Sequence, residues 1–433
     1  MNLEIWIFCF VCLSGVWLLL ILRLKGTDRK FIAFTLFIAI FFRFFLAFIL
    51  YEISIGRGEE GAFLGRDDLL FLNMGRDLSN YWKSHNIFSL PPYGIWPSSP
   101  SIHLYYFICA TANFLFGQFD LPILLSLNAL IGSATVLLVY KLGSNFGGSK
   151  VGTLAAFIMA VHPRMVFWSS VNFRDSYLLL IFTFVILKLS LYFRCHKGSL
   201  LLKSLLYGVI LMLFRFYFGL LVLIGTIWIS YIKNRTYLNK KRVAERALAF
   251  ILTAFFILSL SYPLYMFSIK HFSRFALIQS IGIDKRADEG SFARLMVGLT
   301  PLERIICTPF GMLTSFVTPF PPWNISGDEI HNITAVMNFS WLPFLGFIGW
   351  SAWRLFKVDR WQMYLMIFFL MIMLFPVSFM SFVGSARGLN PGFGILTVMI
   401  AFGIRNCRNK TGILLLTSII VLLGAILFNF FHG

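Results

Sequence analysis

The chain of 433 residues is 58% hydrophobic and only 13% charged, with a mean hydropathy of +0.81. Soluble domains carry roughly 25% charged residues, so this composition excludes a water-soluble globular protein. The net charge of +19 does not indicate nucleic-acid binding, because no basic patch belongs to a soluble module, and the six cysteines show neither a disulfide framework nor a zinc-site pattern.

Apolar runs recur along the chain with lengths of roughly 17 to 25 residues, enough to cross a bilayer as a helix. They are rich in Leu, Ile and Phe and lack a period of two, which predicts helices and not a β-barrel. The first run lacks a basic start and a small-residue cleavage site, so it is interpreted as a span and not as a signal peptide. In chain order the runs are 3–22, 31–51, 120–140, 151–168, 176–193, 201–214, 216–232, 247–268, 339–356, 361–381, 389–404 and 411–430.

The loop charges predict the topology. Lys and Arg cluster in alternate short loops, which the positive-inside tendency places in the cytoplasm. This alternation works only if the short apolar stretch 101–117 does not cross the membrane, so we expect it to lie at the outer interface. Of the 18 acidic residues, only Asp28, Glu245 and Asp359 then face the cytoplasm. The sequence thus predicts an all-α polytopic bundle of about 12 spans with large outer loops at 52–119 and 269–338.

The first outer loop contains adjacent carboxylates, Asp67 and Asp68, flanked by Arg66 and followed by Arg76. Neighbouring carboxylates at a membrane boundary suit a general base, because partial burial and mutual repulsion favour the protonated form of one of them. The alternative is structural: acids also favour the first turn of an interfacial helix, where they complement the helix dipole. The loop is therefore a candidate catalytic site.

A second outer loop is short and carries Arg174 and Asp175 at the start of an apolar run. A local ion pair or a helix cap would explain them equally well. Arg43 lies inside a span, where a charge usually meets an anion or a wet cavity, whereas Arg215 lies between two runs and could simply reach the interface. Arg387 precedes a later span. Several arginines on one face suit a phosphate-bearing lipid.

Two lone histidines, His103 and His162, also lie near the predicted outer surface. Packing explains them better than metal ligation, since no HExxH motif is present. No GxGxxG or Walker motif indicates nucleotide binding either.

The order of these features resembles the GT-C superfamily of polyprenyl-phosphate-dependent glycosyltransferases, and within it the protein O-mannosyltransferase and lipid A aminoarabinose transferase group. The resemblance covers residues 31–232 well and the remainder loosely. It departs from the group in having Asp-Asp where Asp-Glu is usual, in an extra first span, and in the lack of an appended soluble domain. The matching segments are Arg43 before Asp67–Asp68, Arg76 nine residues after Asp67, Pro97–Tyr106, Phe116–Gly117, Val139–Gly143, His162–Ser169, Arg174–Ser176, Arg387–Pro391 and Ala401–Ile404.

The resemblance implies a transfer of sugar at the outer membrane face. Asp67 would act as the general base on an acceptor, with Asp68 beside it and Asp175 orienting the acceptor or, together with Asp67, a divalent metal ion. The segment 301–323 could form a lid over the acceptor or be a plain interfacial helix. The implied donor-phosphate ligands are Arg43, Arg174, Arg215 and Arg387, with Arg66, Arg76, His103 and His162 nearby.

The implied organisation has three parts: an extra span and turn at 1–30, a catalytic membrane module at 31–232 and a C-terminal membrane module at 233–433. The partners would be a polyprenyl-phosphate sugar, the bilayer, and a glycan, lipid or protein acceptor. We expect a bacterial inner membrane with the site on its outer face. Two alternatives stay open, an O-antigen-type polymerase or ligase and a flippase or transporter of lipid-linked sugars.

Overall fold

The computed structural model describes residues 3–22, 28–58, 63, 66–85, 103–237, 333, 337, 340–381 and 390–432. Within these ranges the chain is helical and contains no β-strand. It divides into two units, each described by itself. Unit 1 comprises Met1–Leu220, Pro343–Val358 and Asn390–Thr417, and unit 2 comprises Leu221–Leu342, Asp359–Leu389 and Ser418–Gly433.

The predicted apolar runs form helices where the structure describes them, apart from a break at His162 and a turn at 340–341, and the run 247–268 lies outside the described residues. The helices of unit 1 are α1 (Leu3–Leu22), α2 (Arg29–Gly56), α3 (Arg66–Ser84), α4 (His103–Phe116), η1 (Gly117–Phe119), α5 (Asp120–Gly147), α6 (Ser149–Val161), α7 (Pro163–Trp168), α8 (Asp175–Cys195), α9 (Gly198–Phe214), α14 (Leu345–Val358) and α16 (Phe393–Asn406). The remaining described elements are α10 (Phe216–Tyr237), η3 (Leu342–Phe344), α15 (Arg360–Ser381) and α17 (Lys410–His432).

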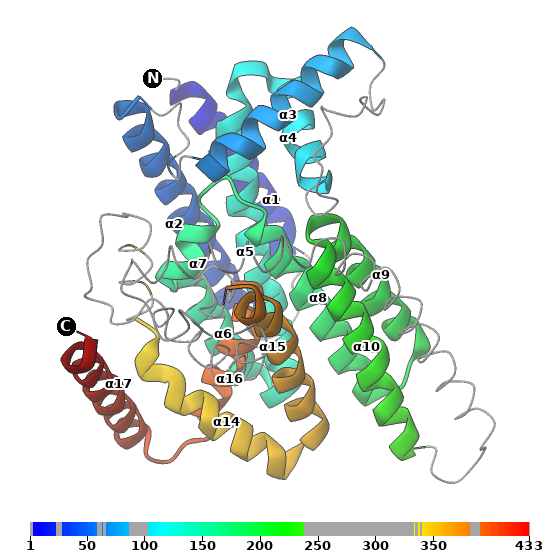
Figure 1. Ribbon diagram of the computed structural model, residues 1–433, viewed down its shortest axis with the longest axis vertical. Coiled ribbons are helices and arrows are strands. Elements are labelled where there is room, and N and C mark those ends of the chain that lie inside the picture. The colour runs from blue at the N-terminus through cyan, green and yellow to red at the C-terminus, as the bar shows by residue number, and fades with distance from the viewer. Residues whose placement is uncertain are drawn as a thin grey trace. The chain divides into compact units, whose positions relative to one another are not determined.

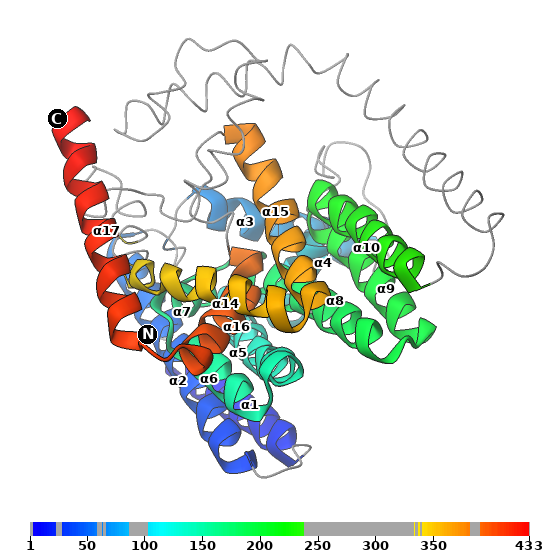
Figure 2. The same cartoon turned by 90° about the horizontal axis from the view of Figure 1, so that it is seen from below.

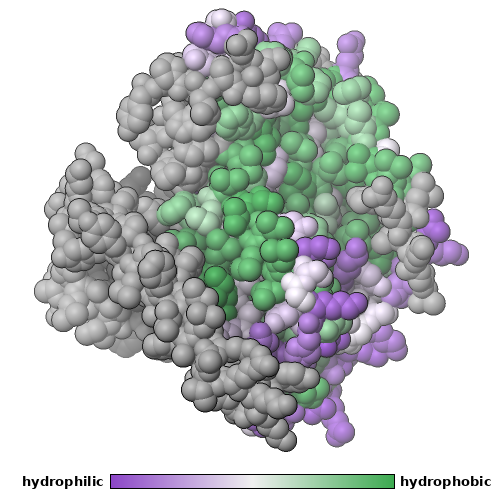
Figure 3. Space-filling model, turned by 90° about the vertical axis from the view of Figure 1, so that its right-hand side faces the viewer, coloured by the Kyte–Doolittle hydropathy of each residue, from purple (hydrophilic) through white to green (hydrophobic). Residues whose placement is uncertain are grey.

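Among the described residues, three helical stretches are long and apolar enough to cross a membrane: Arg29–Gly56, Leu104–Gly147 and Asp175–Cys195. Many large hydrophobic side chains are exposed on the described helices, such as Phe34 and Phe45 of α2. Figure 3 shows a broad hydrophobic surface with hydrophilic residues gathered toward its ends. Such a surface is stable only in lipid, so this is a membrane protein.

The stretch Leu104–Gly147 is interrupted, and the break isolates α4. Gly117 has a positive φ of 59°, and the single 3-10 turn η1 redirects the chain from α4 into α5. Helix α4 has 14 residues and is therefore about 21 Å long, less than the roughly 30 Å of a hydrocarbon core. It packs along α3 instead, where a Cβ on Gly75 would come within 2.5 Å of the Cβ of Cys109. At this length α4 does not cross a bilayer by itself, and the position of 101–117 at the outer interface stays a prediction.

Helix α5 forms the centre of unit 1, with α2, α6, α8 and α16 packed around it, while α3 and α4 cross near its N-terminal end (Figures 1 and 2). Glycines permit the closest of these contacts: a Cβ on Gly143 of α5 would lie 2.9 Å from the Cα of Gly152 in α6. Asn145 of α5 also donates a hydrogen bond to Ser190 of α8 (2.5 Å). Small residues and interhelical hydrogen bonds are what hold helices together in lipid, where apolar burial alone drives little association.

Candidate active site

The run 151–168 was expected to be one helix, and the structure corrects this: α6 ends at Val161 and α7 begins at Pro163. Pro163 has no N–H, so it cannot bond the carbonyl of Met159 four residues earlier. The next N–H, that of Arg164, donates to Nδ1 of His162 (3.2 Å) and not to Ala160. The break therefore leaves two buried carbonyls that need other donors.

Arg43 supplies those donors. Its Nη2 bonds the carbonyl of Met159 (2.9 Å) and its Nη1 bonds the carbonyl of Ala160 (2.9 Å), and the whole side chain is buried. On the same side, Ser170 donates to the backbone carbonyl of Arg43 (2.8 Å). A positive group at a helix C-terminus also complements the helix dipole. In this structure, then, the intramembrane arginine closes a helix break, and His162 is the N-cap of α7.

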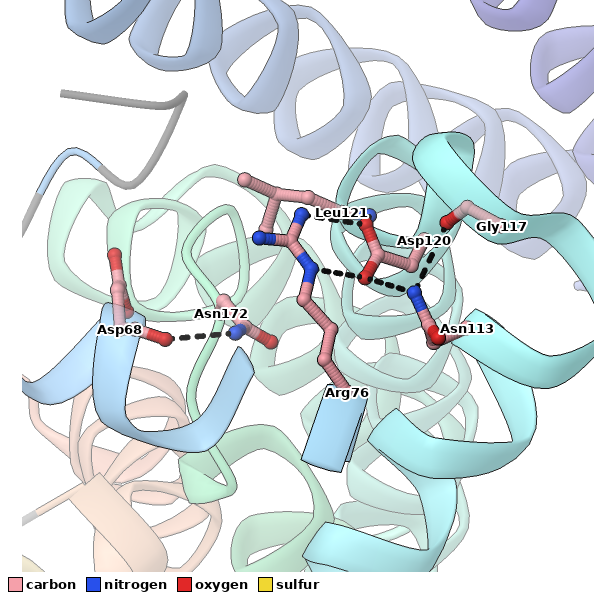
Figure 4. Close-up of polar contacts among 7 residues, drawn as sticks. All are labelled: Asp68, Arg76, Asn113, Gly117, Asp120, Leu121 and Asn172. Atoms are coloured by element: carbon pink, nitrogen blue, oxygen red, sulfur yellow. Dashed lines mark hydrogen bonds and ion pairs between the residues drawn. The ribbon is translucent and has the colours of Figure 1, made fainter. Parts of the chain in front are cut away.

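The start of α3 meets the segment between α7 and α8, two places that the loop charges predicted to face outward. Asp68 is 1% exposed, and its backbone carbonyl accepts a hydrogen bond from Nδ2 of Asn172 (3.2 Å), as Figure 4 shows. The amide oxygen of Asn172 in turn accepts from the hydroxyl of Tyr105 in α4 (2.8 Å). Asn172 thus joins the carboxylate-bearing turn of α3 to helix α4.

Asn128 of α5 bonds the same segment between α7 and α8. Its Nδ2 lies within hydrogen-bonding distance of the carbonyls of Val171 (2.7 Å) and Phe173 (3.2 Å) and of the Tyr105 hydroxyl (3.3 Å). The side chains of Asn128, Tyr105 and Asn172 are all fully buried. We call these three residues, together with Asp68, the outer network. A buried polar network of this kind fixes its backbone firmly, because any broken bond leaves an unsatisfied group.

Arg174 extends from this segment toward α3 and α9. Its guanidinium lies 5.8 Å from the ring centroid of Phe71 in α3, and its Nη1 donates to the carbonyl of Phe214 (3.1 Å). Phe214 is the last residue of α9, and Arg215 follows it in an extended conformation. The structure therefore brings Arg174 next to the backbone that carries Arg215.

Asp175 begins α8 and is 2% exposed. It interacts electrostatically with Arg164 of α7, which is fully buried. Arg164 also donates from Nε to the amide oxygen of Asn390 (2.9 Å) and lies 5.8 Å from the ring centroid of Phe393. The segment that begins at Asn390, 226 residues after Arg164, thus becomes part of this region.

Arg76 has a separate partner. It forms a two-point ion pair with Asp120, with Nε–Oδ2 at 2.9 Å and Nη2–Oδ1 at 3.2 Å (Figure 4). Asp120 is fully buried and also accepts from Asn113 Nδ2 (3.0 Å) and from the backbone N–H of Leu121 (2.8 Å). This cluster ties α3 to the corner between α4 and α5.

The structure therefore gathers Asp68, Arg174 and Asp175 around one buried segment, while Arg43 and Arg76 have partners of their own. The side chains of Arg66, Asp67 and His103, and all of Arg387 and the segment 301–323, lie outside the described residues. Within the described part of the chain, no three His, Cys, Asp or Glu side chains are grouped to hold a metal ion.

Sequence reasoning missed the residues that organise the site: Asn128, Tyr105, Asn172, Asp120, Arg164 and Asn390. Asn128 and Asp120 did leave a signal, because a buried amide or carboxylate within or at the edge of an apolar run is costly unless it has partners. The partner residues could not be named without the fold.

The arrangement offers two buried carboxylates, Asp68 and Asp175, and the guanidinium of Arg174 around one segment. A carboxylate there can accept a proton, and a guanidinium can bind an anionic group. Neither the known protein-family models nor the curated protein sequences match this chain.

Proposed function

We propose that this membrane protein is a GT-C-type glycosyltransferase that moves a sugar from a polyprenyl-phosphate donor to an acceptor at the outer membrane face. One observation carries the proposal. The carboxylate-bearing turn of α3 is joined through Asn172 to the segment that carries Arg174 and Asp175. In this proposal Asp67 is the proton acceptor and Arg174 the phosphate-binding group, and their segments are held together through Asn172, which suits an inverting transfer.

In the proposed reaction the acceptor hydroxyl or amine loses its proton to Asp67. Its oxygen or nitrogen bonds the anomeric carbon from the face opposite the leaving group, and the bond from that carbon to the phosphate oxygen breaks, so the configuration inverts. Asp68, anchored through its backbone, holds Asp67 in position. Asp175 orients the acceptor. A divalent metal ion held by Asp67 and Asp175 is compatible with this scheme but is not required by it.

The leaving polyprenyl phosphate carries negative charge that must be stabilised. We assign this role to Arg174, whose side chain bonds the carbonyl of Phe214, to the next residue, Arg215, and to Arg387. Arg43 has an indirect part. Its guanidinium donates to backbone carbonyls and so holds the break between α6 and α7 in place.

The proposal includes a polytopic bundle of about 12 spans, in a bacterial inner membrane with the site on the outer face. The acceptor would be an envelope glycan, a lipid or a protein.

A transfer assay tests the assignment. Purified full-length protein in detergent would be incubated with radiolabelled polyprenyl-phosphate hexoses and pentoses and with lipid, glycan and peptide acceptors. We expect Asp67→Asn to lower the transfer rate by about 10²- to 10⁴-fold, the usual contribution of a general base. Asp77→Asn is the matched control, because Asp77 is an exposed carboxylate on the same helix.

Equal activity of Asp67→Asn and wild type would refute the base assignment. Movement of the lipid-linked sugar across reconstituted vesicles without any transfer would favour the flippase alternative instead.

A further inference from the structure

Three lysines meet at the end of unit 1 that lies away from α3, one from each of three adjacent helices. They are Lys141 of α5, Lys188 of α8 and Lys203 of α9. Helix α8 packs against both α5 and α9. This end of unit 1 holds no residue of the proposed active site, so a ligand bound among the lysines is independent of the proposed function.

Hydrogen bonds between the helices fix the three lysines in register. Four residues beyond Lys141, Asn145 donates to Ser190, two residues beyond Lys188 (2.5 Å). On the other side Ser204, next to Lys203, donates to the carbonyl of Val185 (3.2 Å). Near this bond, the rings of Phe184 and Tyr207 stack at 4.8 Å. Helix packing therefore holds the backbone segments that carry the three lysines side by side, and Lys188 interacts electrostatically with the other two.

Carboxylates of the described residues do not balance the charges of the three lysines. Lys188 is partly buried and interacts electrostatically with both Lys203 and Lys141. Within the described residues none of the three forms an ion pair with a carboxylate, and Asp28, which lies nearby, instead accepts a hydrogen bond from Tyr140 (3.1 Å). Like charges held together repel, and the repulsion is relieved when an anion binds among them.

An exposed apolar stripe begins beside these lysines. Leu202, Leu206, Val209 and Leu213 recur at the spacing of one helix face and are 59%, 54%, 48% and 48% exposed. On this side of the molecule Figure 3 shows hydrophobic surface adjoining hydrophilic groups near one end. A ligand with a phosphate at the lysines and hydrocarbon chains along the stripe would satisfy both features.

We propose that Lys141, Lys188 and Lys203 form a binding site for the phosphate of one anionic phospholipid, whose acyl chains lie along α9. Basic pockets between membrane helices recognise anionic headgroups in this way, with roughly 1 kcal/mol from each cationic side chain near the surface. The ligand class is a phosphodiester lipid with a net negative charge.

The test measures binding of phosphatidylglycerol to the full-length protein in neutral detergent, by native mass spectrometry and by the rise in Tm on lipid addition. We expect the triple variant Lys141→Gln/Lys188→Gln/Lys203→Gln to bind about 100-fold more weakly, from roughly 1 kcal/mol per lysine. Lys30→Gln/Lys150→Gln, which removes two exposed lysines on α2 and α6, is the matched control and should bind as wild type does.

The triple Lys→Arg variant keeps the charges and should retain the binding. The triple Gln variant removes only the repulsion among the three lysines and no attractive ion pair. Its Tm without lipid should therefore not fall. Equal binding of phosphatidylcholine, or an equal loss in the control variant, would overturn the site. Displacement of the lipid by millimolar inorganic phosphate would show a free-phosphate site and overturn the lipid assignment.

Discussion

Arg43 and the outer network both bury polar groups within unit 1, yet they use them differently. At the break between α6 and α7 a charged side chain donates to backbone carbonyls. In the outer network, uncharged amides and a phenol hold a loop and leave the charged side chains of Arg174 and Asp175 beside it. A buried arginine in an apolar helix therefore does not by itself mark a ligand site, whereas buried amides can mark the frame of one.

The largest expected effect concerns Arg43. Arg43→Met should lower the free energy of unfolding by about 2–6 kcal/mol, because two buried carbonyls lose their donors at roughly 1–3 kcal/mol each. Thermal unfolding in detergent, followed by gel filtration, measures the loss.

Pro163→Ala sharpens this prediction. Alanine restores an N–H that can bond the carbonyl of Met159, so the double variant Arg43→Met/Pro163→Ala should recover part of the stability. Arg43→Met could instead unfold at the wild-type temperature and no longer bind the polyprenyl-phosphate donor. That result would mean that Arg43 binds the ligand and does not serve the helix break.

A smaller effect is expected at the ion pair of Arg76 and Asp120. Arg76→Met removes a two-point contact from a fully buried carboxylate, but Asn113 and the N–H of Leu121 still serve it. Since a hydrogen bond to a charged group is worth about 1.5–3 kcal/mol, we expect a loss of about 2 kcal/mol. Denaturant titration would measure it, and Lys83→Met, on an exposed residue of the same helix, is the control. A loss no greater than that of the control would mean that the pair does not hold α3 in place.

The smallest effect on stability is expected within the outer network itself. Tyr105→Phe removes one donor to Asn172, so stability should fall by only about 1 kcal/mol. Transfer should suffer more: kcat should fall about tenfold with KM little changed, because small displacements of a catalytic group are costly.

Tyr106→Phe is the control for Tyr105→Phe, since its hydroxyl makes no hydrogen bond within the described part of the chain and the residue is buried as well. If both variants kept full transfer activity, the network would be merely structural.

The helices could be predicted from the sequence because the length and composition of an apolar run determine whether it can cross a bilayer. The run 120–140 lies within α5, and 176–193 lies within α8, although α5 continues to Gly147 and α8 to Cys195. The break at Pro163 was visible as a proline but not as the end of a helix, because proline is tolerated in membrane helices. What closed it was an arginine 117 residues earlier in the chain than Ala160.

The candidate site was only partly predictable. Asp68, Arg174 and Asp175 stood out as charges at the ends of apolar runs, and the structure places them near one another. The partners of Arg76 and Arg43 did not stand out, since a carboxylate such as Asp120 and the carbonyls of a broken helix carry no local pattern. Helix packing decides which charged side chains come into contact. Because packing depends on the whole bundle, these pairs could not be predicted from local sequence.

The bond between Arg43 and Ala160 spans 117 residues, and this has a consequence for how the protein is made. Helix α2 leaves the ribosome long before α6 and α7 exist. During that interval its guanidinium sits in a helix otherwise suited to lipid, without the carbonyls of α6 to receive it. A nascent α2 should therefore stay near the insertion machinery, where water and protein can shelter the charge, and be released into the bilayer only once the later helices arrive. The order of synthesis and the order of membrane entry then need not coincide.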